Sequence, residues 1–173
     1  MRTRAHRAAL LAVALAACTP AVGRRANIPA DAAAADSVRG IIERIGSDPT
    51  TQLVVRQSDG VVCALHLIGS PPIEGLEVEL WGRRDDASAT MIPGVACTFA
   101  AARYAVRAVD GVAAVDGILR ADGPASAIET ADGVRRPLRD VPSLLRTQAG
   151  ARIYWAGPLD RAPAAYGVLA PAP

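Results

Sequence analysis

The sequence predicts an all-β fold built from two small tandem barrels. Helical periodicity is weak throughout, except that Val141–Gln148 predicts one short helical turn. Short apolar runs are separated by Asp-Gly dipeptides, a strong hairpin signal because glycine accepts a positive φ. An internal repeat divides the β region into two similar parts. The five dipeptides are Asp59-Gly60, Asp110-Gly111, Asp116-Gly117, Asp122-Gly123 and Asp132-Gly133.

Residues 1–17 have the pattern of an export signal. Arg2, Arg4 and Arg7 form a basic segment, and the uncharged run Ala8–Ala17 follows it. Ten helical residues reach about 15 Å, half of a hydrocarbon core that is roughly 30 Å thick. The run is therefore too short for a membrane span and typical of a secretory signal.

The end of this run, Leu15-Ala16-Ala17-Cys18, resembles the lipobox of bacterial lipoproteins. The resemblance implies that Cys18 carries a diacylglycerol thioether, that a peptidase cuts before it, and that its new N-terminus is acylated. Thr19 follows the cysteine, which implies the periplasmic face of the outer membrane if the host has two membranes. The alternative is an ordinary cut after Ala16, which would leave a soluble periplasmic protein.

The composition argues against nucleic acid as a partner. The chain has 19 arginines and no lysine, and removal of residues 1–17 would leave 16 arginines against 17 acidic residues. A nearly neutral domain lacks the basic surface expected of a general nucleic-acid binder. Without lysine, Ser-Lys dyads, Schiff-base chemistry and a phosphate-binding P-loop are excluded.

The mature chain is predicted to begin with Cys18 and a disordered tether to residue 36. This segment is rich in Ala and Pro and has no apolar periodicity. About eighteen flexible residues span roughly 20–25 Å on average. The folded part is then expected to comprise a first barrel, residues 37–110, and a second barrel-like repeat, residues 111–170.

Two pairs of similar segments define the repeat. Val38–Ile45 resembles Val115–Asp122 at an offset of 77 residues, and Gly75–Gly82 resembles Gly150–Gly157 at an offset of 75. The order of strands, hairpin and glycines resembles small OB-like or SH3-like barrels of uncharacterised bacterial envelope proteins. Glycines of this kind mark bends or bulges in barrel strands.

The two copies differ at their C-terminal ends. Cys97–Asp110 is expected to supply a closing strand to the first copy, whereas the second copy ends soon after Ala165–Leu169. The second barrel is therefore expected to be smaller or to borrow an edge. A single pseudo-symmetric β sandwich or barrel made of both copies is the rival architecture.

Cys63 and Cys97 are predicted to form a disulfide. With Cys18 lipidated, they are the two remaining cysteines of a protein in an oxidising compartment. A redox pair is the alternative, but the chain has neither a Cys-x-x-Cys motif nor a thioredoxin-like βαβ pattern.

The sequence offers no convincing catalytic set, metal site or cofactor site. His66 is the only histidine after the signal, and it is expected on the outer face of a strand. The chain has no Gly-x-Ser-x-Gly nucleophile elbow, and one histidine with a bridged cysteine pair cannot build a nitrogen/sulfur metal site. We therefore expect no enzyme and no cofactor.

Alternation along two equivalent strands points to a possible ligand or interface site. Glu77, Glu79 and Trp81 are expected to face outward in the first copy, and Arg152 and Tyr154 in the second. The acidic pair would complement Arg152 across an interface between the copies. The two aromatic rings would either pack between the copies or stack on a sugar or peptide.

These patterns favour a membrane-anchored envelope lipoprotein that serves as a non-catalytic binding or structural module. Its partners would be the membrane, through the lipid, and an envelope protein or glycan. Two alternatives stay open: a hydrolase acting on cell wall or glycan, and an oligonucleotide- or oligosaccharide-binding protein.

Overall fold

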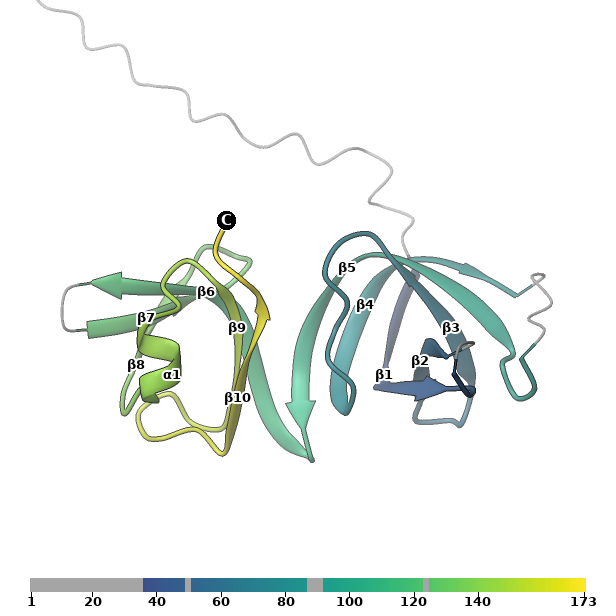
Figure 1. The fold of residues 1–173 in the computed structure, drawn as a ribbon, viewed down its shortest axis with the longest axis horizontal. Helices are drawn as coiled ribbons and strands as arrows, with labels where there is room; N and C mark the ends of the chain where they lie inside the picture. The colour runs from purple at the N-terminus through teal and green to yellow at the C-terminus, as the bar shows by residue number, and fades with distance from the viewer. Residues whose placement is uncertain (1–35, 49–50, 87–91, 123–124) are drawn as a thin grey trace, which may run out of the picture. The chain divides into compact units, whose positions relative to one another are not determined.

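The computed structural model describes residues 36–48, 51–86, 92–122 and 125–173 (Figure 1). They form ten strands and one short helix, and the prediction of an all-β barrel fold is confirmed. The strands are β1 (Asp36–Ile45), β2 (Gln52–Gln57), β3 (Val62–Leu67), β4 (Leu76–Asp85), β5 (Cys97–Val109), β6 (Val112–Asp122), β7 (Ala125–Glu129), β8 (Arg135–Leu138), β9 (Arg152–Ala156) and β10 (Ala165–Ala170). The helix is α1 (Ser143–Arg146), within the segment predicted to form a helical turn.

Strands β1 to β5 close into a barrel, called here the N-terminal barrel. Around the barrel the strand order is β1-β2-β3-β5-β4, and β4 pairs with β1 to complete the circle. All these pairings are antiparallel except β3–β5, which is parallel. A closed five-stranded barrel of this kind is OB-like and leaves no unpaired strand edge.

Alternating side chains fill this barrel. In β4, residues with small or no exposure alternate with half-exposed ones, as expected for a strand with one face toward a core. Strand β5 is long enough to pair with β3 through its first half and with β4 along its length. The prediction that Cys97–Asp110 supplies the closing strand is confirmed.

Strands β6 to β10, called here the C-terminal repeat, pair in the same order as the N-terminal barrel. Strand β6 pairs with β7 and β9, β7 pairs with β8, and β9 pairs with β10. Within the part of the chain that the structure describes, β8 and β10 do not pair, although their equivalents β3 and β5 do. At the end of β8 the chain is instead held by a hydrogen bond from Arg139 N to Leu159 O, 2.9 Å long.

The register of the strands supports the duplication. Gly40 of β1 lies opposite Val78 of β4, and Gly117 of β6 lies opposite Ile153 of β9. Their offsets are the 77 and 75 residues of the sequence repeat. The backbone hydrogen bond from Gly75 N to Ile42 O has its counterpart in the bond from Gly150 N to Leu119 O, and both are 2.8 Å long.

One of the five Asp-Gly dipeptides does not form the predicted hairpin turn. Asp116-Gly117 is not a hairpin turn but lies inside β6. A Cβ at Gly117 would collide with the carbonyl oxygen of Glu129 on the neighbouring strand, and one at Gly40 would collide with that of Arg56. Glycine is used at both positions for close strand approach. By contrast, Asp110 and Gly111 both have positive φ and form the turn between β5 and β6.

Two cross-strand ion pairs recur in both copies with their charges exchanged. One joins the first strand of each copy to the fourth, and the other joins the first strand to the second. The pairs are Arg39–Glu77 and Asp116–Arg152, then Glu43–Arg56 and Arg120–Glu129. The positions therefore keep electrostatic complementarity while the signs are reversed between the copies.

Candidate functional site

Strand β4 carries three of the predicted site residues, Glu77, Glu79 and Trp81, all half-exposed. Their neighbours along the strand are buried as expected: Leu76, Val78 and Leu80. The equivalent residues in the second copy are also buried: Ala151, just before β9, and Ile153 and Trp155 within it.

The acidic side chains of β4 do not pair with Arg152, contrary to expectation. Glu77 accepts a hydrogen bond from Arg39 Nε at 2.7 Å, and Glu79 accepts one from Arg107 Nε at 2.9 Å. Each carboxylate thus pairs with an arginine on the strand beside it. Both arginines are on strands that pair directly with β4, which brings their side chains within cross-strand reach of the two carboxylates.

Arg152 instead joins three strands. Its Nε donates to Asp116 Oδ2 at 2.8 Å, and its Nη2 donates to the carbonyl oxygen of Tyr104 at 2.6 Å. The guanidinium also lies 4.2 Å from the centroid of the Tyr104 ring. Asp116 Oδ1 accepts the backbone N–H of Val106 at 2.9 Å. These contacts fasten β6 and β9 to β5.

Tyr154 is a packing residue in the structure. Its side chain is only 9% exposed and belongs to the same buried cluster as Tyr104. The ring lies over Gly167, where a Cβ would come within 2.6 Å of Tyr154 Cε1. Burial raises the pKa of both tyrosine hydroxyls. Of the two predicted aromatic contact residues, only Trp81 is accessible enough to contact a ligand.

A wide groove of about 910 Å³ contains Trp81 and Arg152. Strands β4, β5 and β6 contribute to its walls, together with the turn between β7 and β8 and the start of β8. The volume falls in the range of ordinary small-molecule sites, about 300–1,000 Å³. The polar and aromatic residues that line it are Trp81, Arg103, Tyr104, Arg107, Asp116, Glu129, Thr130, Asp132, Arg136 and Arg152.

Trp81 and two arginines of β5 form one cluster in this groove. The Arg103 guanidinium carbon lies 4.2 Å from the Trp81 ring centroid, and that of Arg107 lies 5.6 Å from it. Both distances are within the range of cation–π attraction. The β4–β5 register explains the cluster, because Arg103 is directly opposite Trp81 and Arg107 lies four residues further along β5, at the register shift between Val78 and Glu77.

The acidic residues of the groove are already engaged. Hydrogen bonds from Arg120 and Arg135 hold the pKa of Glu129 below its usual value. Hydrogen bonds from the Thr130 hydroxyl and the Val134 N–H lower the pKa of Asp132. Both groups are therefore carboxylates at neutral pH. Asp116, the third acid, is bound by Arg152 as described above.

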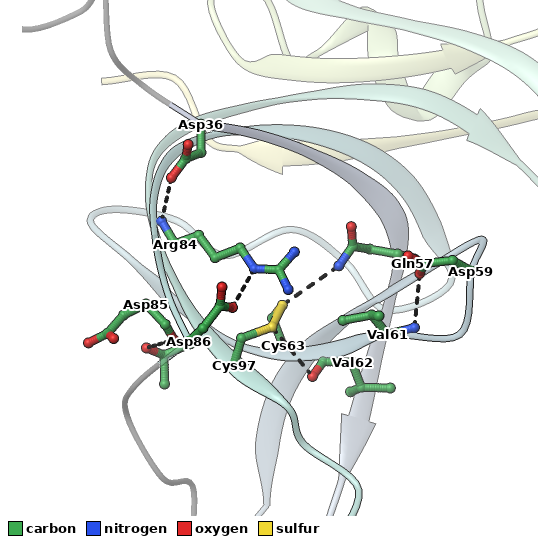
Figure 2. The surroundings of a disulfide bond; sticks show 11 residues. Asp36, Gln57, Asp59, Val61, Val62, Cys63, Arg84, Asp85, Asp86 and Cys97 are labelled. Carbon is green, nitrogen blue, oxygen red and sulfur yellow. Dashed lines mark hydrogen bonds and ion pairs between the residues drawn. A yellow bond between two sulfur atoms is a disulfide. The ribbon is translucent and has the colours of Figure 1, made fainter.

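The predicted cysteine pair forms a disulfide in the structure (Figure 2). Cys63 and Cys97 are opposite each other at the start of the parallel β3–β5 pairing, with Cα atoms 4.5 Å apart. Gln57 Nε2 donates to Cys63 Sγ at 3.8 Å. The disulfide therefore links β3 to β5. The equivalent strands of the described C-terminal repeat, β8 and β10, do not pair.

Sequence reasoning missed Arg103, Arg107 and Arg136. A signal was present in RYAVRAV, where arginines four residues apart share one strand face. Their meeting with Trp81 depends on the β4–β5 register, and the approach of Arg136 depends on the path of the C-terminal repeat. Neither of these long-range relations can be predicted from the local sequence pattern.

Cys18, the predicted lipidation site, lies outside the described residues. His66 is exposed on β3 and is not among the residues lining the groove. In the described ranges, no helix is long and apolar enough to cross a membrane, and no group of three or more His, Cys, Asp or Glu side chains is placed to hold a metal ion. No protein-family model, curated protein or solved structure matches the chain.

Proposed function

We propose that this chain is a lipid-anchored binding module of the bacterial cell envelope. Cys18 holds it to the membrane, and its OB-like barrel fold presents the groove at Trp81 to an envelope component. The groove is the observation that carries the binding role. It brings aromatic and guanidinium groups from separate strands into one cavity large enough for a ligand.

The location rests on the N-terminal sequence. Leu15-Ala16-Ala17-Cys18 follows a basic segment and a short apolar run, the arrangement expected of a lipoprotein signal. The Cys63–Cys97 disulfide is consistent with an exported protein, because disulfides persist in oxidising compartments. Acyl chains on one cysteine give stable anchoring because each buried methylene contributes about 0.8 kcal/mol.

Membrane fractionation of a Cys18→Ser variant tests the anchor. In a host with two membranes, the wild-type chain should sediment with the outer membrane, and the variant should appear in the soluble fraction. A Cys63→Ser/Cys97→Ser double variant is the matched control. It removes the disulfide but keeps Cys18, so it should remain with the membrane.

The mass of the mature N-terminus gives an independent reading. A diacylated or triacylated Cys18 supports the proposal. An unmodified residue after Ala16 or Ala17, or a Cys18→Ser variant that sediments as before, contradicts it.

A further inference from the structure

We infer that the groove binds an anionic group, a carboxylate or a phosphate, carried by a sugar chain of the envelope. This inference deepens the proposed function and rests on it. It starts from a specific imbalance: the acidic side chains of the groove have hydrogen-bond or ion-pair partners, whereas two of its guanidinium groups form no salt bridge with any residue that the structure describes.

Arg103 is the first of these cations. Its side chain is exposed, and its guanidinium is stacked 4.2 Å from the centroid of the Trp81 ring. Among the described residues it forms no ion pair. Stacking on an aromatic ring limits the rotation of the guanidinium and leaves its in-plane N–H donors available. A planar fork of this kind suits bidentate contact with a carboxylate or phosphate.

Arg136 is the second cation, and it lies on the opposite copy. It belongs to β8 and lines the same groove as Arg103, without an ion-pair partner in the part of the chain that the structure describes. Its charge contributes only weakly to the lowered pKa of Asp132, after hydrogen bonds from Thr130 and Val134. The groove therefore offers unpaired cations from both copies.

The remaining charges nearly cancel. Arg107 is matched by Glu79, and Arg152 is matched by Asp116. Glu129 is held between two arginines, Arg120 and Arg135. The Asp132 carboxylate accepts hydrogen bonds from Thr130 and Val134 and has Arg136 as a cationic neighbour. The groove residues and their ion-pair partners together contain six arginines against four acids, so the surplus is positive. Arg103 and Arg136 are the arginines of this set that form no salt bridge with a described residue.

The aromatic residues of the groove favour a sugar chain over a nucleic acid as its ligand. Its aromatic residues are Trp81 and Tyr104, and Tyr104 is only 5% exposed. Single-strand nucleic-acid binders use several open rings on which successive bases stack. One accessible indole beside guanidinium groups instead matches a sugar ring that bears an anionic substituent.

Calorimetric titration of the full lipidated chain in neutral detergent micelles tests the inference. The probes are oligogalacturonate, which carries carboxylates, phosphorylated oligomannose, which carries phosphates, and neutral dextran. At least one anionic probe should bind, and dextran should not. Arg103→Gln and Arg136→Gln should each weaken binding about tenfold or more, because each removes a charged hydrogen-bond donor pair.

Arg161→Gln is the matched control. It removes the same charge from an exposed side chain that does not line the groove. Arg103→Lys keeps the charge but loses the planar fork, so its affinity should lie between those of wild type and Arg103→Gln. Unchanged melting temperatures identify these variants as folded.

The possible results distinguish a carboxylate ligand from a phosphate ligand, and they include results that would overturn the inference. Binding of oligogalacturonate alone assigns a carboxylate, and binding of phosphorylated oligomannose alone assigns a phosphate. Equal weakening by Arg161→Gln, equal binding of dextran, or no binding of either anionic probe overturns the inference. Cys18 does not line the groove, so the titration does not depend on the fractionation result. A failure of membrane anchoring would therefore be distinguishable from a failure of ligand binding.

Discussion

Two glycines inside strands, Gly40 and Gly117, set how closely neighbouring strands approach. At both positions a Cβ would meet a backbone carbonyl oxygen, which cannot rotate away. We expect Gly40→Ala and Gly117→Ala each to lower the free energy of unfolding by about 1–3 kcal/mol, toward the upper end, through overpacking. Denaturant unfolding measures this.

Gly60→Ala is the comparison for that experiment. Gly60 has positive φ, but nothing lies within 4 Å of a Cβ built there. Its replacement should cost only backbone strain, about 1 kcal/mol. If Gly117→Ala costs no more than Gly60→Ala, close strand approach is not the reason for glycine in β6.

At this scale the sequence predicted the glycine repeat correctly but interpreted one dipeptide wrongly. Asp-Gly is a turn signal at Asp110, where both residues adopt positive φ. At Asp116 the same dipeptide lies within a strand. There the Asp116 side chain binds Arg152, and Gly117 leaves room for the backbone carbonyl of Glu129. Tertiary contacts, which a dipeptide does not encode, decide between the two.

Among the elements, β3 and β5 distinguish the closed barrel from the open repeat. Their parallel pairing begins at Cys63 and Cys97, and the disulfide links the two strands there. The cysteines are 34 residues apart, so the chain-entropy model assigns the bridge about 3–4 kcal/mol. We expect Cys63→Ser/Cys97→Ser to lower the unfolding free energy of the protein by that amount.

Reductant provides the control. It should lower the melting temperature of the wild-type protein toward that of the double variant, and it should leave the double variant unchanged. Two thiols at Cys63 and Cys97 that react with a labelling reagent before reduction would contradict the bridge.

The strands themselves were largely predictable, because alternation and turns are local signals. The all-β class, the short helical turn and the closing role of Cys97–Asp110 all follow from such signals. The missing pairing between β8 and β10 does not. It depends on strand β10 being short and on the segment around Leu159 bonding to Arg139, and both are long-range outcomes.

In the molecule as a whole, a small polar cluster couples the N-terminal barrel to the C-terminal repeat. Asp116 holds Arg152 and the Val106 N–H, and Arg152 in turn holds the Tyr104 carbonyl. The Asp116 side chain is 9% exposed and that of Arg152 is 28% exposed. Loss of one member therefore leaves polar groups unpaired in a place that water reaches poorly.

We expect Asp116→Ala to lower the unfolding free energy by about 2–3 kcal/mol, below the 3–5 of a fully buried pair because Arg152 is partly exposed. Asp86→Ala is the control, since it breaks an exposed pair with Arg84 and should cost little.

Denaturant unfolding followed by both circular dichroism and tryptophan fluorescence also reports cooperativity. Coincident transitions are expected for wild type, because one buried cluster contains Tyr104 from β5 and Tyr154 from β9. An equal cost for both substitutions would show that Asp116 does not couple the two copies, and the unpaired cations of the groove would then lack a fixed spacing.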